Sequence, residues 1–229
     1  GFILGNTMSP TFVFLILFFL SIIVSLIIYM NGLPKDLDFK GEGEKLKIPE
    51  KNVLIFGFLL FVIFGSNGII IDWSALWFTK ELNAPLYLAS LGLICLSFGG
   101  IFANLFSNQL INLFSEKIVG CYFVIFGSLI LFSSIIIGNF YFILITFFFY
   151  GFLTANLVPI IIRQAVKHSS ESIPTTVTNL ITMGFSALLF APAIIGFIAE
   201  TYSLTINMYA LCIIVFIAGN IFLRKFRVN

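Results

Sequence analysis

Charged residues are scarce in this 229-residue chain: they make up 10% of it, against 60% for hydrophobic residues. A water-soluble domain carries about 25% charged residues. So few charges cannot cover a surface that faces water, so lipid must cover much of this chain. The net charge of +2 is also too small to indicate a nucleic-acid partner.

Residue patterns that carry catalysis are absent from the sequence as well. It has a single histidine, His168, and no HExxH, GxSxG, GxGxxG or Walker A pattern. Its three cysteines, Cys95, Cys121 and Cys212, form no CxxC pair and no cluster with histidine, which is typical of small apolar side chains in packed helices. We therefore expect no enzyme activity, no cofactor and no metal site.

Long apolar runs dominate the sequence instead. A helix of roughly 20 apolar residues crosses the hydrocarbon core of a bilayer. The runs are too long for strands and lack the period-two alternation of a barrel. The sequence therefore predicts an all-α transmembrane fold with seven helices, none of which contains Lys or Arg. The helices are expected at about residues 8–30, 53–72, 86–107, 118–138, 140–162, 175–199 and 204–223.

Basic residues indicate how these helices are oriented. Seven spans place 11 of the 12 Lys and Arg residues on one side and Lys80 alone on the other. Because basic loops stay in the cytoplasm, we expect a multi-pass protein of a bacterial inner (plasma) membrane with a cytoplasmic C-terminus. The loop at residues 31–52 is then a solvated cytoplasmic tether, for which contact with anionic lipid is a second reading.

The start of the chain predicts that it continues a longer protein. Gly1 lies on the outer side in this arrangement, and neither Met nor a signal-peptide pattern precedes the first span. Five further helices would give six helices, a long cytoplasmic loop and six helices. In that layout residues 1–30 are the sixth helix, residues 31–52 the interdomain loop and residues 53–229 a C-terminal six-helix bundle.

Three motifs resemble those of a known family. Residues 66–76 read SNGIIIDWSAL, similar to the EGxxxDWSAxY stretch that ends the seventh helix in the YbjJ-like branch of the major facilitator superfamily. That branch is itself distantly similar to the fucose permease. Residues 151–159, GFLTANLVP, and 191–200, APAIIGFIAE, resemble its tenth-helix GxGxANxxP and eleventh-helix GPPxIGxxAE motifs. The likeness covers about residues 1–225, and the seven helices would correspond to helices 6–12 of that fold.

The sequence departs from the family at two places. Asn67 stands where the first motif has Glu. The loop after the eighth helix, usually similar to GDRLVDRFGRR, reads SNQLINLFSEK at residues 107–117. Both of its acids are Asn here and most basic residues are gone, so the resemblance does not extend to the charge-relay gate that this loop provides in the superfamily.

Polar side chains inside apolar helices are costly and are therefore functional candidates. The helices of Asn67 and Asn156 line the central cavity in the superfamily, and their amides suit substrate hydroxyls; a hydrogen bond between helices explains them equally well. Asp72 and Trp73, followed by Trp77, suit a sugar at the cavity mouth; an interfacial anchor or a helix cap is the alternative. The candidate substrate-binding residues are Asn67, Asp72, Trp73 and Asn156.

Small residues and prolines in the spans indicate packing. Gly99 and Ala103 form a small-xxx-small pair that permits two helices to approach closely. Pro159 and Pro192 each remove a backbone hydrogen bond and are expected to bend their helices.

The resemblance implies a secondary transporter that works by alternating access, with two six-helix halves around a mid-membrane site. Its implied solute is a sugar or another small metabolite, and efflux of a drug or metabolite fits the resemblance equally well. Coupling to H⁺ is implied by analogy and would use carboxylates of the N-terminal half, because Asp72 is the one plausible buried acid here. The expected partners are the lipid bilayer, the solute and that N-terminal six-helix half.

A heptahelical receptor or photoprotein is the alternative, because seven spans with an outer N-terminus fit that class too. Against it, the last span has no Lys to hold retinal, and no cysteine pair is placed to link the outer loops. The 22-residue charged loop after the first span also differs from that class.

Overall fold

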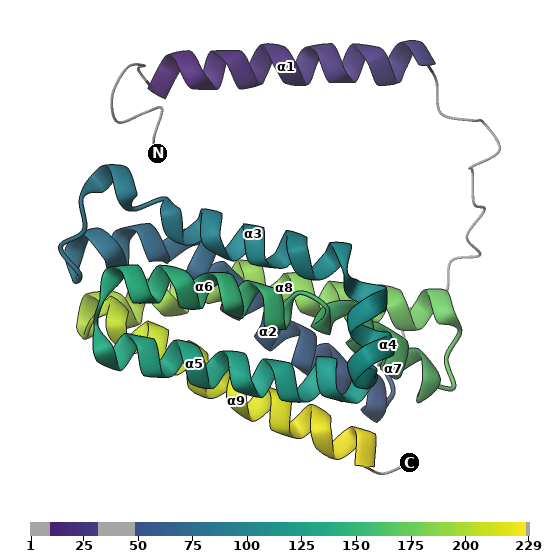
Figure 1. Cartoon of the computed structure of the whole chain (residues 1–229). Coiled ribbons are helices and arrows are strands. Elements are labelled where there is room, and N and C mark those ends of the chain that lie inside the picture. The colour runs from purple at the N-terminus through teal and green to yellow at the C-terminus, as the bar shows by residue number, and fades with distance from the viewer. Residues whose placement is uncertain (1–9, 32–48, 228–229) are drawn as a thin grey trace. The chain divides into compact units, whose positions relative to one another are not determined.

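The computed structural model describes residues 10–31 and 49–227 and is helical nearly throughout them (Figure 1). The chain divides into two units, residues 1–48 and residues 49–229. All seven predicted apolar runs are helical, so the predicted all-α class is confirmed. Most of the predicted tether, residues 32–48, lies outside the described residues.

The described part of the first unit is one helix, α1 (Pro10–Asn31). Its 22 residues are almost all apolar. At 1.5 Å per residue the helix is about 33 Å long, which matches the thickness of a bilayer core.

The second unit contains six helical segments that are long and apolar enough to cross a membrane. Three of the segments are built from more than one element, and consecutive segments run in opposite directions (Figure 1). The elements are α2 (Lys51–Lys80), the 3₁₀ turn η2 (Leu86–Leu88) with α3 (Leu91–Leu105), α4 (Ser107–Lys117), the π turn η3 (Ile118–Tyr122) with α5 (Phe123–Ile137), α6 (Phe140–Thr154), α7 (Leu157–Lys167), α8 (Ile173–Thr201) and α9 (Leu204–Arg227).

Short polar motifs set the ends of several helices. The Asn139 side chain accepts a hydrogen bond from the Phe142 amide at 3.1 Å and so caps the start of α6. Ser172 caps α8 in the same manner. Gly138 ends α5 with a φ of 68°, a left-handed conformation in which glycine is favoured. These signals explain why the short predicted link at residue 139 falls where the sequence places it and why α8 begins at Ile173.

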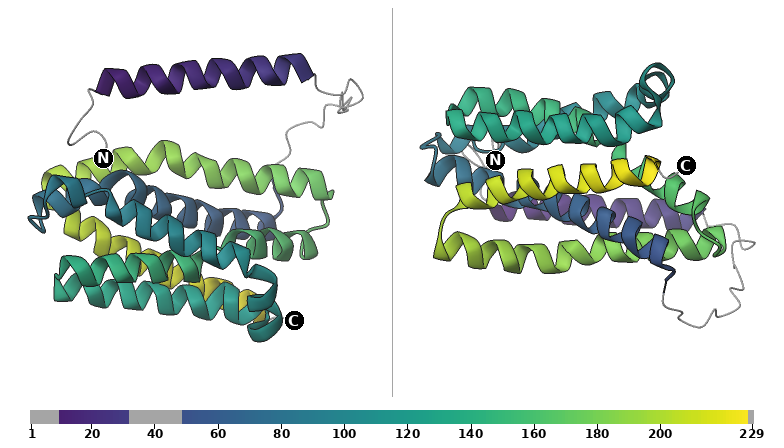
Figure 2. Two further views of the ribbon diagram at one scale, coloured as in Figure 1. Left: turned by 45° about the horizontal axis from the view of Figure 1, so that its top comes forward. Right: turned by 90° about the horizontal axis from the view of Figure 1, so that it is seen from below.

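The six segments pack side by side in the order α3, α6, α5, α9, α2 and α8 (Figure 2). The largest buried side chains are aromatic and come from α2, α6 and α9. The two segments at the ends of this order, α3 and α8, bury the smallest share of their side chains. Large apolar side chains therefore project from α8: Phe185, Leu188, Leu189, Phe190, Ile194 and Phe197.

Helix α2 is longer than the sequence predicts, because residues 73–80 continue it instead of forming a loop. Trp77 and Phe78 are almost completely buried, and Phe78 packs against Phe140 and Phe147 of α6. This burial keeps residues 73–80, the last two turns, helical although Asp72 before them and Lys80 at their end are charged. Asp72 thus lies within a helix, so it caps no following segment.

Residues 107–117 form the helix α4 instead of a link. This short helix is amphipathic: half-buried Leu110 and Ile111 pack against the core, while Leu113 and the polar residues Asn108, Gln109 and Asn112 are exposed. Ser115 interrupts it with a φ of 72°, a conformation that costs about 1 kcal/mol or more for a residue with a Cβ. The chain turns here from α4 into the η3–α5 span.

The predicted bend at Pro159 is a break in the helix, between α6 and α7, at Ala155 and Asn156. Proline has no N–H group, and its ring clashes with the carbonyl four residues earlier. For Pro159 that carbonyl belongs to Ala155, where the helix is interrupted. Pro192, in contrast, lies inside α8, which continues past it.

Helices α3 and α6 approach so closely that glycine is required on both. A Cβ at Gly99 would lie 1.9 Å from the carbonyl oxygen of Phe148, and a Cβ at Gly151 would lie 2.1 Å from that of Leu96. Gly99 and Ala103 are both buried at this contact, as the small-xxx-small pair predicts. Gly151 is the matching residue on the partner helix.

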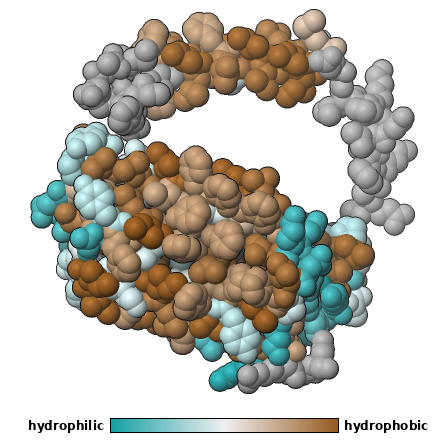
Figure 3. Space-filling model, in the orientation of Figure 1, coloured by the Kyte–Doolittle hydropathy of each residue, from teal (hydrophilic) through white to brown (hydrophobic). Residues whose placement is uncertain are grey.

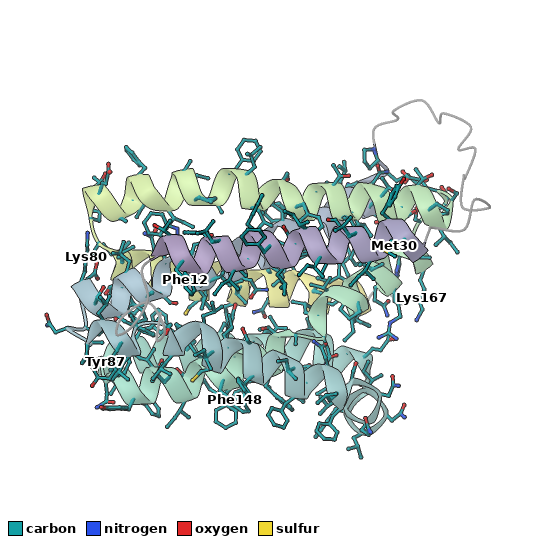
Figure 4. The ribbon with its side chains drawn as sticks, turned by 90° about the horizontal axis from the view of Figure 1, so that it is seen from above. Phe12, Met30, Lys80, Tyr87, Phe148 and Lys167 are labelled. Atoms are coloured by element: carbon teal, nitrogen blue, oxygen red, sulfur yellow. The ribbon has the colours of Figure 1, made fainter. Side chains whose placement is uncertain are left out.

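The described basic residues of the bundle lie at one end, except Lys80, which lies at the other (Figure 4). Figure 4 shows Lys80 and Lys167 at opposite ends, and Figure 3 shows an apolar surface between more hydrophilic ends. Apart from Lys80, the described Lys and Arg residues fall where α2 starts or where α4, α7 and α9 end; we name this end of the unit the basic end. They are Lys51, Lys117, Arg163, Lys167, Arg224, Lys225 and Arg227.

Candidate functional site

Asn67 lies close to the middle of α2. The helix has 30 residues, so Asn67 is about 2 Å from its midpoint along the axis. The side chain is half-buried, and its amide makes no hydrogen bond with any residue that the structure describes. An amide without a partner at this depth is costly in lipid. Asn67 can therefore donate to and accept from a polar ligand.

Asp72 lies on the same helix but on an exposed position. If a hydrocarbon core of about 30 Å is centred on α2, the carboxylate lies about 5 Å inside its boundary. Asp72 forms no ion pair or hydrogen bond with the described residues. Because Asp is too short to reach the headgroups easily, its carboxylate needs water or a partner at this position.

Trp73 and Trp77 occupy different environments. Trp73 is half-buried against α8, where a Cβ at Gly196 would lie 3.6 Å from its ring. Trp77 is only 1% exposed and lies roughly parallel to Phe147 in the core. Its ring cannot stack on a sugar, so the predicted contribution of Trp77 to a sugar site is wrong. The signal that was misread is the WSALW spacing, which puts Trp77 one turn from Trp73 on the inner side.

Asn156 sits at the break between α6 and α7, about 4 Å from the midpoint of that span. Its side chain is buried and donates a 3.2 Å hydrogen bond to the carbonyl of Ala103 in α3. The Oδ1 atom has no partner among the described residues. The Asn156 side chain thus joins the α6–α7 break to α3 through its Nδ2 group, and its Oδ1 atom stays available as an acceptor. No hydrogen bond joins Asn156 to the α2 candidates in the described part of the chain.

A buried tyrosine at similar depth was missed by the sequence reasoning. Tyr150 on α6 is 1% exposed, and its hydroxyl has no hydrogen-bond partner among the described residues. Ser66 of α2 and Cys212 of α9 are polar neighbours. The signal in the sequence is slight: one tyrosine closes the run of phenylalanines at residues 147–149.

At the end of the bundle that holds Lys80, Glu81 binds the start of α9. Its carboxylate accepts hydrogen bonds from the backbone amides of Leu204 and Thr205 at 2.6 and 2.9 Å and from the Thr205 hydroxyl at 2.6 Å. The Trp77 indole donates to that same hydroxyl at 2.8 Å. A carboxylate at a helix N-terminus satisfies free N–H groups and opposes the positive end of the helix dipole.

At the basic end, Glu116 of α4 holds the end of α7. It pairs with Arg163 at 3.3 Å and Lys167 at 3.9 Å, and accepts from Gln164 at 2.8 Å. Glu116 belongs to the loop in which the family's usual charges are missing, so one acid still links this loop to its neighbour.

Glu50, just before α2, joins the starts of α2 and α8. Hydrogen bonds from the Ser170 hydroxyl and amide hold the pKa of its carboxyl below the ordinary value. Its stabilising effect is therefore present above the ordinary carboxyl pKa and is lost as the pH falls through the lowered value. We expect Glu50→Gln to remove this part of the acid sensitivity, which pH-dependent thermal unfolding measures. An unchanged pH profile in the variant would contradict this role.

Similar proteins identify the class of this helical bundle. An uncharacterised MFS-type transporter of Yersinia pestis is 28% identical over 194 residues, which cover 80% of this chain and 49% of that protein. The chain is homologous to an MFS-type transporter. Membrane protein MosC of Rhizobium meliloti is 29% identical over 180 residues, 75% of this chain and 43% of MosC. No family model and no solved structure matches the chain.

These relatives confirm that the chain is a membrane protein, and the Yersinia pestis relative confirms the resemblance to MFS-type transporters. The chain spans about half the length of the curated relatives it matches. The structure has six helical segments that are long and apolar enough to cross a membrane. The Yersinia pestis relative is named as a transporter.

Proposed function

We propose that this chain forms one wall of the solute pathway of a secondary transporter that works by alternating access. Asn67 carries the proposal: an unpartnered amide at the midpoint of α2 needs a polar neighbour. Sites of such transporters lie near the bilayer midplane. Asn156 and Tyr150 add unused hydrogen-bonding atoms at similar depth on the α6–α7 span.

The remaining part of the pathway would come from a second six-helix half. Two observations support this: the relatives are about twice as long as the chain, and α3 and α8 leave their apolar sides uncovered within this unit. Transport then needs both halves, and the basic end faces the cytoplasm by the positive-inside rule. The heptahelical receptor has no similar support, since the matching relative is named as a transporter.

The solute we propose is a sugar or another small polar metabolite. Neutral amides on α2 and the α6–α7 break suit hydroxyl groups, and Asp72 provides a carboxylate that accepts hydrogen bonds. Asp72 is the one acid within the apolar part of a described span. Coupling to H⁺ would therefore depend mainly on carboxylates of the second half.

Thiol labelling tests whether Asn67 lines the pathway. With Cys95, Cys121 and Cys212 replaced by Ala, Asn67→Cys in native membranes should react with a charged, membrane-impermeant thiol reagent, because the pathway contains water. Asn220→Cys is the matched control, since Asn220 bonds its own helix at the Phe216 carbonyl; it should stay unlabelled. If Asn67→Cys does not react with the reagent, Asn67 does not line the pathway.

Uptake of labelled monosaccharides tests the solute class. Asn67→Ala should lower uptake about tenfold, as expected when one polar contact worth about 1–1.5 kcal/mol is lost, and Asn220→Ala should not. Unchanged uptake by Asp72→Asn would exclude the carboxylate from the site. If no monosaccharide enters cells with the wild-type protein, the sugar proposal fails while the labelling result still decides on the pathway.

A further inference from the structure

A groove of about 510 Å³ lies between the start of α2 and the end of α9, at the basic end of the bundle. It is remote from Asn67, because the residues of α2 that line it end nine positions, about 13 Å, before that residue. The lining residues come from these two helices alone: Lys51, Leu54, Ile55, Phe58, Ile221, Arg224 and Lys225.

The polarity of this groove changes along its length. Lys51 and Arg224 lie at its outer rim, where α2 begins and α9 ends. Phe58 lies about 10 Å further along α2, towards the bilayer centre. Leu54 and Phe58 keep 38% and 54% of their surface exposed, so no helix of the second unit covers this apolar wall. The groove thus has a cationic mouth and an apolar floor.

The cations at the mouth lack acidic partners. Lys51 and Arg224 are exposed and form no ion pair with described residues, and Lys225 only donates to Asn52 Oδ1 at 3.4 Å. The carboxylate of the neighbouring acid, Glu50, accepts hydrogen bonds from the amide and the hydroxyl of Ser170 and forms no ion pair with these described cations. The other basic cluster of this end differs, because Glu116 pairs with both of its cations. The groove therefore concentrates positive charge that calls for an external anion.

We propose that this groove binds one anionic phospholipid of the cytoplasmic leaflet. Its phosphate would lie among Lys51, Arg224 and Lys225, and an acyl chain would cover Leu54 and Phe58. Such a lipid combines a negative headgroup and an apolar tail in the order that the groove presents, and basic pockets between transmembrane helices bind lipids of this kind. The leaflet follows from the proposed orientation, whereas the binding itself depends on neither orientation nor transport.

Lipid titration of the purified chain in a neutral detergent tests the proposal. Native mass spectrometry should detect one bound phosphatidylglycerol with higher affinity than phosphatidylcholine. The variant K51Q/R224Q should bind phosphatidylglycerol roughly thirtyfold more weakly, since each basic residue near an anionic headgroup contributes about a factor of five. Its phosphatidylcholine affinity should not change. Neither side chain has a partner within the described residues, so this variant should fold, which circular dichroism verifies.

A matched control separates a specific groove from general surface charge. R163Q/K167Q removes the same charge from the same end and should bind phosphatidylglycerol within about threefold of the wild type, because Glu116 already pairs with both of these cations. Equal weakening by both variants would overturn the proposal. So would unchanged binding by K51Q/R224Q.

Two further experiments distinguish a bound lipid from other ligands of the groove. Phe58→Ser should weaken phosphatidylglycerol binding by shortening the apolar floor, and inorganic phosphate should not displace the lipid. Displacement by phosphate, with no effect of Phe58→Ser, would assign the cations to a free anion and overturn the lipid proposal. These results leave the Asn67 labelling test unaffected, so the two proposals can fail separately.

Discussion

Gly99→Ala should lower the free energy of unfolding of the bundle by about 3 kcal/mol or more. The added methyl group would lie 1.9 Å from the carbonyl oxygen of Phe148 and 2.9 Å from the amide nitrogen of Phe152. Both are backbone atoms, so no side-chain rotation relieves the clash and α3 must move away from α6. Thermal unfolding in detergent, with tryptophan fluorescence as the signal, measures the loss.

Gly100→Ala is the control for this prediction. It makes the same chemical change one residue later in α3, but its methyl group would meet only the Cβ of Ala155, at 3.9 Å. Alanine favours helix over glycine by about 0.5–1 kcal/mol, so this variant should be as stable as the wild type or slightly more stable. Equal destabilisation by both changes would show that the close α3–α6 contact is wrong.

Glu81→Ala should cost the bundle about 2–4 kcal/mol. The substitution leaves the amides of Leu204 and Thr205 without their acceptor and removes a negative charge from the N-terminus of α9. The Thr205 hydroxyl, which also holds the Trp77 indole, loses its acceptor as well. We expect a lower unfolding midpoint and a red-shifted tryptophan emission, because water reaches the end of α9.

Glu200→Ala is the matched change for Glu81→Ala. Glu200 is exposed, near the same end of the bundle, and has no hydrogen bond or ion pair with the described residues. Its removal should change stability by less than about 0.5 kcal/mol. A loss as large as that of Glu81→Ala would mean that negative charge at this end, and not the link to α9, stabilises the protein.

The positions of the helices could be predicted because the bilayer imposes them. A span must be long, apolar and free of Lys and Arg, and these constraints act locally along the chain. Helix ends were harder, because tertiary burial decided them. Trp77 and Phe78 extend α2 past Asp72, and no local pattern indicates that α6 covers them.

The candidate site could be predicted only in part. Asn67 and Asn156 stand out as polar residues in apolar runs, and both lie near the middle of their spans. Their partners could not be read from the sequence: the Ala103 carbonyl that binds Asn156 is 53 positions away. Glu81 and Thr205 are separated by 124 positions, so their contact depends on how the helices are arranged in space. The roles of Asn67, Asp72, Trp73 and Asn156 in binding stay predictions.

Accessibility of single cysteines tests the central claim that the bundle crosses the membrane with its basic end in the cytoplasm. Lys80→Cys and Lys117→Cys, each in a background free of the native cysteines, are treated in intact cells with an impermeant thiol reagent. We predict that Lys80→Cys is labelled at once and that Lys117→Cys is labelled only after the membrane is opened. Labelling of both positions from the same side would contradict the six-span arrangement, and labelling of Lys117→Cys alone would reverse the orientation.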